Sequence, residues 1–203
     1  NAGQIGSVGD ADAMAISSGG VVTFSQNTVG AGGMDLLLDD TISSAVAQYD
    51  ISSTYINGTY DDYILSFNLA PATNDVHLDT RVFVGGTIQT GSIYGFEISH
   101  SGSSSYDSSN ASTVFRQTLS AVGNASGEYI SGRLHLRNVN STTFAFNYIG
   151  GNNLYNISGV HVSVNSYGML IIANRANVVN GFRLFFSSGN IASGTVKLFG
   201  IRS

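Results

Sequence analysis

Alternation of apolar and polar residues is the feature that most constrains this chain. In Tyr63–Leu69 every second residue is large and apolar, and in Val76–Val84 the apolar face lies opposite His77, Asp79 and Arg81. A period of two is the pattern of a β-strand that buries one face. Because the turn-forming segment 70–75 separates the two runs, we expect them to pair as an antiparallel hairpin.

The rest of the chain continues this pattern and predicts an all-β fold. No amphipathic segment of about 12 or more residues competes with the strands, and at most 52–60 forms one helical turn. Short strands separated by Gly, Ser and Asn clusters indicate an antiparallel β-sandwich, jelly-roll-like in kind. Further strands are predicted at Ile42–Ile51, Ile93–His100, Thr113–Leu119, Gly132–Val139, Thr143–Tyr148, Gly159–Val164, Met169–Asn174, Gly181–Phe186 and Thr195–Ile201.

Residues 1–33 differ from the remainder, because they are rich in Gly and small side chains and contain few large apolar groups. Within them, Ala13–Ile16 and Val21–Phe24 flank Ser-Ser-Gly-Gly and predict strand, tight turn, strand. A hairpin of this kind is marginal alone, so we expect it to pair with copies from other chains or to lie along the following domain. The predicted organisation is a shaft or linker at 1–33 and a β-sandwich head at 34–203.

Composition removes several classes of function. The chain has 203 residues, eight Lys and Arg, a net charge of −5 and no Cys. The acidic balance argues against a nucleic-acid partner, and the missing cysteines exclude disulfides, thiolate metal sites and a cysteine nucleophile. No apolar run reaches the length of a membrane span and no signal-peptide pattern is visible, so we expect no membrane insertion.

Few titratable residues stand where they could converge. His77, Asp79 and Arg81 share one face of a predicted strand and could line a groove as acid, base and anion clamp; the alternative is a solvated outer sheet face. The adjacent acids Asp39-Asp40 and Asp61-Asp62 could supply calcium ligands, although turn positions explain them as well. We predict no catalytic residues, no metal-ligating residues and no cofactor, with a structural cation such as calcium left open.

Aromatic residues near loop ends are the better binding candidates, since Tyr gives rigid, amphipathic contact area. Tyr106 and Asp107 fall in the Ser-rich stretch 99–112, which we expect to be an exposed loop. Tyr60 and Tyr155 lie beside other predicted loops. Together with His77, Asp79 and Arg81, these residues form the predicted receptor-binding set.

Two segments carry a resemblance to a known class of protein. The stretch from Gly181 to Ile201, GFRLFFSSGNIASGTVKLFGI, resembles the closing hairpin of tail-fibre and other virion proteins of tailed, notably marine, phages, and residues 13–25 resemble the shaft repeats that precede a distal domain. The resemblance implies a homotrimeric adhesin with an N-terminal shaft that joins other virion proteins. It transfers no binding or catalytic residue.

The sequence therefore predicts a virion attachment protein, a trimeric phage tail fibre or receptor-binding domain found in the extracellular particle. Its partner would be a host surface glycan or an outer-membrane protein, bound without catalysis. Three alternatives remain open at this point. They are a capsid head fibre or decoration protein, a polysaccharide-degrading tail spike, and a cellular carbohydrate-binding module.

Overall fold

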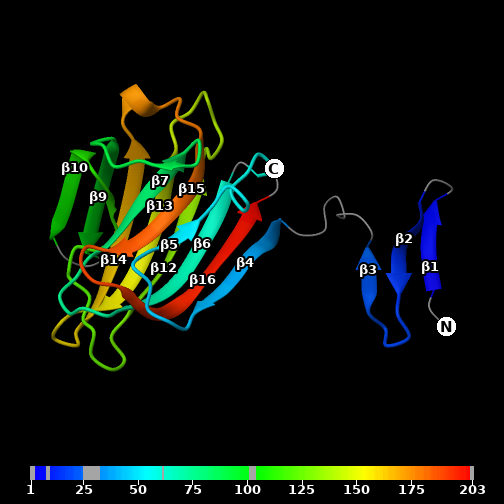
Figure 1. The fold of residues 1–203 in the computed structure, drawn as a ribbon, viewed down its shortest axis with the longest axis horizontal. Helices are drawn as coiled ribbons and strands as arrows, with labels where there is room; N and C mark the ends of the chain where they lie inside the picture. Colours follow the sequence, from blue (N-terminus) through cyan, green and yellow to red (C-terminus); the bar gives the residue numbers. More distant parts are fainter. Residues whose placement is uncertain (1–2, 8–9, 25–32, 61, 101–103, 202–203) are drawn as a thin grey trace. The chain divides into compact units, whose positions relative to one another are not determined.

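The computed structural model describes residues 3–7, 10–24, 33–60, 62–100 and 104–201. The chain forms two compact units, Asn1–Gly33 and Met34–Ser203, here called the N-terminal unit and the sandwich unit (Figure 1). Every regular element of the described residues is a β-strand apart from one short 3₁₀ turn, η1 (Ile172–Asn174). The fold class predicted by the alternation is therefore confirmed.

The N-terminal unit is an antiparallel sheet of β1 (Gly3–Ser7), β2 (Asp10–Ile16) and β3 (Val22–Phe24), in that order. The predicted strand–turn–strand is present, with Met14 opposite Phe24. Its turn is closed by a hydrogen bond from the Ser17 amide to the Val21 carbonyl. Gly20 has a φ of 79°, a left-handed conformation that favours glycine.

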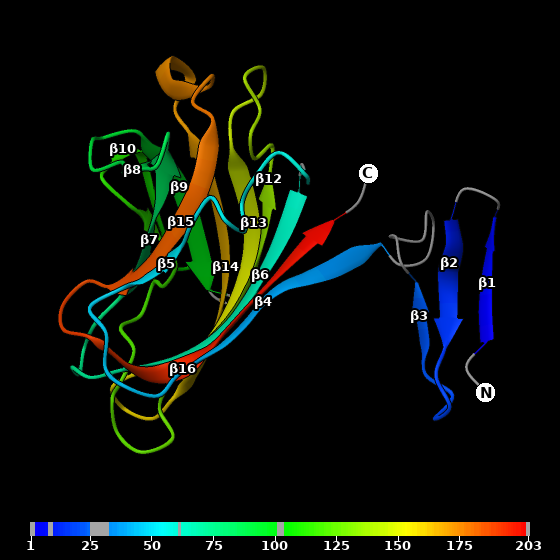
Figure 2. The same cartoon turned by 45° about the vertical axis from the view of Figure 1, so that its right-hand side comes forward.

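The sandwich unit consists of two antiparallel sheets that face each other (Figure 2). The larger sheet has eight strands, in the order β10 (Tyr106–Ser112), β9 (Tyr94–His100), β14 (His161–Leu170), β13 (Asn147–Tyr155), β12 (Ile130–Arg137), β6 (Asp62–Pro71), β16 (Ile191–Ile201) and β4 (Met34–Ile42). The smaller sheet has the order β11 (Phe115–Arg116), β7 (Leu78–Val84), β15 (Val179–Phe186) and β5 (Tyr49–Ile51), with β8 (Thr87–Ile88) paired to β7.

The hydrophobic core fills the space between the two sheets. Alternate residues of each strand point inward, as in β6, where Tyr63, Leu65, Phe67 and Leu69 are buried and their neighbours are more exposed. The smaller sheet contributes Leu78, Val82, Phe182 and Leu184 from the opposite side. This is the arrangement expected when two one-sided sheets bury their apolar faces against each other.

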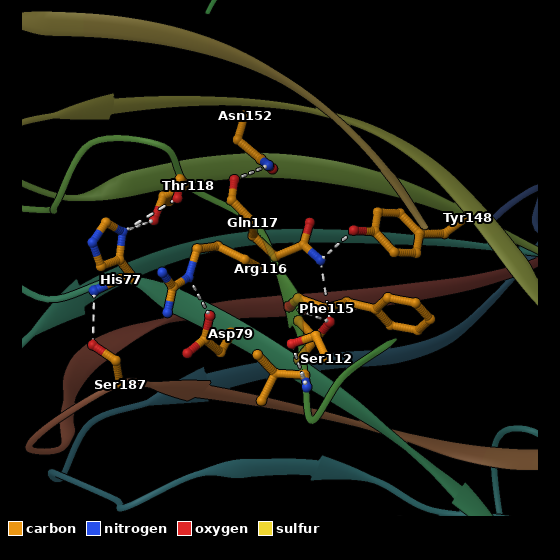
Figure 3. Close-up of polar contacts among 12 residues, drawn as sticks. His77, Asp79, Ser112, Phe115, Arg116, Gln117, Thr118, Tyr148, Asn152 and Ser187 are labelled. Carbon is orange, nitrogen blue, oxygen red and sulfur yellow. Dashed lines mark hydrogen bonds and ion pairs between the residues drawn. The ribbon is translucent and has the colours of Figure 1, made fainter. Parts of the chain in front are cut away.

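A polar bridge crosses the core between the sheets, centred on Gln117 just after β11 (Figure 3). Gln117 Nε2 donates to Thr80 Oγ1 of β7 at 3.1 Å and to the Tyr148 hydroxyl of β13 at 2.9 Å. Its Oε1 accepts from Ser166 Oγ of β14 at 3.1 Å, and its carbonyl accepts from Asn152 Nδ2 at 3.0 Å. All five of these residues are buried, and the network satisfies most of the polar groups that would otherwise be costly to bury. The exception is Asn152 Oδ1, which is buried without a hydrogen-bond partner.

Two predicted hairpins are wrong, for the same reason. The strands at Tyr63–Leu69 and Val76–Val84 belong to different sheets, as β6 and β7. The strands at Gly181–Phe186 and Thr195–Ile201 also separate, as β15 and β16. In both cases the connecting segment crosses from one layer of the sandwich to the other. A short hairpin turn, by contrast, would have kept the two strands in one sheet.

Several predicted strand boundaries also change. Ile42–Ile51 is not one strand, since it spans the end of β4 and all of β5, and the strand predicted at Met169–Asn174 ends at Leu170 and is followed by η1. Thr143–Tyr148 covers only the beginning of β13, and Thr113–Leu119 contains the two residues of β11. Segment 52–60 forms hydrogen-bonded turns and bends without a helix. The expected loop at 99–112 contains β10, while 101–103 lie outside the described residues.

We expect Gly168→Ala to destabilise the sandwich unit by about 1–3 kcal/mol, the usual cost of overpacking a core. A Cβ at Gly168 would collide with the buried rings of Tyr148 and Phe115, and the Tyr148 hydroxyl is held by Gln117. Gly151→Ala on β13 is the matched control, because its Cβ meets open space. Urea unfolding followed by tyrosine fluorescence would measure both variants, and equal midpoints would contradict the packing argument.

Candidate ligand-binding groove

A groove of about 730 Å³ lies on the outer face of the eight-stranded sheet, at the end of the strands next to η1. Its walls come from β10, β9, β14, the beginning of β13 and the segment that follows β14 (Figure 1). The residues that give it chemical character are Glu97, Asn110, Asn147, Ile149, Tyr167, Met169 and Ile172.

Strand register sets the floor of the groove as two parallel rows. In the first row, Glu97 of β9 lies opposite Tyr167 of β14, which lies opposite Ile149 of β13. In the second row, Gly95, Met169 and Asn147 occupy the same three strands. Residues directly opposite one another on one sheet face have Cβ atoms about 5 Å apart, so the first row presents a continuous surface, whereas the second row has no side chain at Gly95.

The hollow of the groove begins at Gly95, which has no side chain beside Met169. A Cβ built at Gly95 would meet the Met169 carbonyl oxygen at 3.4 Å and the Ser109 carbonyl oxygen at 3.7 Å. Both distances are ordinary van der Waals contacts, so glycine is not needed here to avoid a collision. Its effect is instead to leave open space above the sheet. Next to it, the register of β10 against β9 shifts between Ser109 and Ser112.

The groove is mainly apolar, with a few polar groups at its edges. Tyr167 is 45% exposed, Met169 52% and Ile172 76%. Such exposure of several large apolar side chains next to one another is typical of surfaces that bind another molecule. Asn110 and Asn147 contribute amides, and Glu97 contributes a carboxylate. An aromatic and aliphatic floor with amide groups at the rim fits the apolar face and hydroxyl groups of a sugar ring.

His77, Asp79 and Arg81 do not line this groove, since Asp79 and Arg81 belong to β7 of the five-stranded sheet and His77 directly precedes it. Figure 3 shows His77 and Asp79 with their partners. His77 Nδ1 lies 3.0 Å from Thr118 Oγ1, and Asp79 Oδ1 lies 3.2 Å from Nε of Arg116. Arg81 Nε donates to the Thr113 carbonyl at 3.0 Å. Each of the three polar side chains therefore has its own structural partner.

The alternative of a solvated outer face is also wrong for Asp79, which is only 4% exposed. Burial raises the pKa of its carboxyl, and the charge of Arg116 opposes that rise. Burial likewise lowers the pKa of His77. Arg81 also packs against a neighbouring side chain of the same sheet. Its guanidinium lies 5.1 Å from the centre of the Phe185 ring.

Tyr60 is not the exposed contact that was predicted. It is 9% exposed, its ring packs edge-on against Tyr63 at 5.7 Å between centroids, and its hydroxyl donates to Asp35. Gly200 makes room for it, because a Cβ there would lie 2.6 Å from the Tyr60 ring. Tyr60 is thus a core residue with a satisfied hydroxyl group.

Tyr106 and Asp107 lie on opposite faces of β10. Tyr106 is 71% exposed and pairs with Ser99, whose position is on the same outer face as the groove. Asp107 pairs with the buried Ile98 and is half-buried. The two side chains therefore point to opposite faces of the sheet, and neither residue lines the groove.

Tyr155 belongs to a separate aromatic group at the other end of β13. Its ring lies edge-on to Tyr129 at 6.0 Å and to His161 at 6.2 Å. Tyr155 is 37% exposed. The Asn153 side chain beside it accepts a hydrogen bond from Ser163 at 2.7 Å. This group and the groove occupy opposite ends of the same sheet face.

The acidic pairs considered for calcium are engaged elsewhere. Asp39 pairs with Lys197 at 2.8 Å, Asp40 accepts from the Tyr49 hydroxyl at 2.7 Å, and Asp62 lies 3.1 Å from Nε2 of His135. Asp61 lies outside the described residues. Across the part of the chain that the structure describes, no group of three or more acidic or His residues stands close enough to hold a metal ion.

Within these same described residues, no helix has the length and apolar character that crossing a bilayer requires.

The sequence did not reveal the groove because Asn165, Ser166 and Gly168 suggest a turn. They led to a predicted break between Val164 and Met169, whereas β14 continues without interruption. Ser166 and Gly168 point inward, where Ser166 binds Gln117 and Gly168 makes room for Tyr148. The overlooked signal is the alternation of the whole segment, which places Tyr167 and Met169 on one outer face.

No protein-family model, curated protein or solved structure matches this chain. The resemblance of two segments to phage tail-fibre proteins therefore stays a prediction.

For the Asp79–Arg116 pair, we expect Arg116→Gln to lower the free energy of unfolding near neutral pH by about 1–2 kcal/mol, because a buried carboxylate loses its partner. Without Arg116 the burial-driven rise in the Asp79 pKa is opposed only by the weaker effects of His77 and Arg81. Ionisation of a group whose native pKa is raised destabilises the fold as pH rises through that pKa. The loss should therefore shrink on acidification, as Asp79 takes up a proton.

The control for this experiment is Lys197→Gln, which removes an exposed ion pair of similar length and should change stability by less than about 0.5 kcal/mol. Denaturant titrations at several pH values would test both variants. A loss in Arg116→Gln that grows toward acid pH would contradict the assignment.

Proposed function

We propose that this protein is a non-catalytic attachment protein whose sandwich unit binds a surface saccharide in the groove on the eight-stranded sheet. The observation that carries the proposal is the groove itself, with the exposed Tyr167 and Met169 on its floor and amide groups at its edge. Such a site binds by stacking and hydrogen bonding, without bond cleavage. The biological setting we propose is a phage virion, with the domain forming part of a trimeric tail fibre.

The lining of the groove supports binding over catalysis. Glycoside hydrolysis by the usual mechanisms needs two carboxyl groups about 5–10 Å apart. Among the lining residues Glu97 is the only carboxylate, and no His, Lys or Arg lines the groove beside it. A tail-spike hydrolase or lyase therefore gains no support from this site.

Trimeric assembly is the second part of the proposal. It is supported by the small size of the N-terminal unit, a three-stranded sheet of short strands, since sheets of this size gain stability from further partners. In the sandwich unit, Met34 and Leu36 of the edge strand β4 are each more than half exposed. Leu36 lies opposite Phe199, which lies opposite Ile64, so that an apolar row continues inward from the edge.

The proposed site is tested by filling the groove. We expect Gly95→Val to reduce saccharide binding more than tenfold, about 1.4 kcal/mol or more, because the new side chain occupies the hollow beside Met169. The backbone tolerates it, since the Cβ meets only ordinary contacts and valine suits a strand. Binding would be measured on a glycan array and then by calorimetry with the best ligand.

Gly151→Val is the matched control for this variant. Gly151 lies on the same outer face, in β13, and its Cβ would meet open space. The control should bind as the unmodified protein does. Equal binding by both variants would exclude the groove as the site.

Assembly is tested by light scattering on residues 1–203 beside residues 34–203. We expect three times the chain mass for the longer protein and the monomer mass for the shorter one, because the N-terminal unit is proposed to hold the chains together and the exposed edge of β4 is proposed to add contact only once they are assembled. Trimers of both would place the interface in the sandwich unit. Monomers of both would contradict the trimeric fibre.

A further inference from the structure

The groove has one negatively charged lining residue and no positively charged one. Of its lining residues only Glu97 is charged, and the others are apolar, hydroxyl, amide or glycine residues. Glu97 takes part in none of the ion pairs formed within the described residues. A ligand that enters the groove therefore meets one carboxylate, and none of the residues that line the groove is basic.

Two basic residues in the same rows of this sheet face are directed elsewhere. His135 and Arg137 of β12 stand opposite Ile149 and Asn147, and both interact with Asp62, at 3.1 Å and 3.9 Å. In sheet order β12 is three strands from β9. At about 4.8 Å between strands that is about 14 Å, beyond the Debye length of about 8 Å at physiological salt. Neither His135 nor Arg137 therefore neutralises Glu97.

Tyr167 adds a second group that attracts a cation. It is the direct cross-strand neighbour of Glu97 on β14, and 45% of its surface is open to solvent. An aromatic face attracts an ammonium group through its quadrupole, and a carboxylate accepts charge-assisted hydrogen bonds from it. Ring and carboxylate side by side are therefore suited to one small cationic group.

We propose that the groove selects saccharides that carry a free ammonium group, and that Glu97 is the residue that selects them. This inference rests on the proposed function and adds the ligand class. The sugar ring lies on Tyr167, Ile149 and Met169, its hydroxyl groups reach Asn147 or Asn110, and its ammonium group lies against Glu97. Uronic acids, sialic acids and phosphorylated sugars are excluded, because they would place a second negative charge beside an unpaired carboxylate.

The test compares three oligosaccharides of equal length by calorimetry at about pH 6, where a large share of glucosamine amines is protonated while carboxylic acids are ionised. They are a glucosamine oligomer, its fully N-acetylated counterpart and an oligogalacturonate. We expect the glucosamine oligomer to bind most tightly and the galacturonate not to bind. Glu97→Gln should weaken binding of the glucosamine oligomer about tenfold, the loss of one charge-assisted contact, and leave the acetylated oligomer within twofold.

The control variant is Asp39→Asn, which removes one negative charge from the same outer face at the far edge of the sheet. It should leave all three affinities unchanged, and so separates a local effect of Glu97 from an effect of net charge. Circular dichroism would establish that both variants remain folded.

The outcomes distinguish this inference from the proposed function. Binding of the acetylated oligomer as tightly as of the amine, with no effect of Glu97→Gln, would overturn the inference and leave saccharide binding in place. The absence of binding to any of the three and to a glycan array would overturn both. A lysine-rich peptide that binds through Glu97 where glucosamine oligomers do not would overturn the inference in favour of a protein receptor.

Discussion

The hydrogen-bonded bridge at Gln117 is the interaction on which the sandwich unit depends. Strand β11 has only two residues, yet the chain directly after it places a buried amide between the sheets, where it binds Thr80 on one side and Tyr148 and Ser166 on the other. Apolar contacts between two sheets are non-directional, whereas these bonds require one relative position of β7, β13 and β14. The bridge therefore fixes how the two layers align.

The bridge also affects the groove, because β13 and β14 each have one face in the core and the other face in the groove. Tyr148 and Ser166 point into the core, and Ile149 and Tyr167, the next residue on each strand, point into the groove. Because neighbouring side chains on a strand point to opposite faces, the bridge that holds Tyr148 and Ser166 also holds the groove floor. The proposed binding surface is thus the reverse side of the most constrained part of the core, which is the preorganisation that a binding site needs.

Strand identity was predictable from the sequence, while strand partners were not. The alternation in β6, β7, β12, β15 and β16 indicates that one face of each strand is buried. The pattern is identical for a strand of either sheet, so it does not tell which sheet the strand joins. Pairing β6 with β7 failed for this reason. Strand β10 was missed because Ser-Ser-Asn-Ala-Ser contains no apolar alternation, and β14 was divided because its inward positions hold Ser166 and Gly168. The groove needs register across β9, β14 and β13, and no local pattern contains that information.

The exposure of the edge strand β10 bears on how the groove can change in evolution. No residue of Tyr106–Ser112 is buried, although Ser108 and Asn110 belong to the groove wall. Surface substitutions of this kind change stability by about 0.5 kcal/mol or less. The rim can therefore diversify among descendants of this protein while the floor and core stay as they are. Variation in what the proposed groove binds would therefore be concentrated in this one strand.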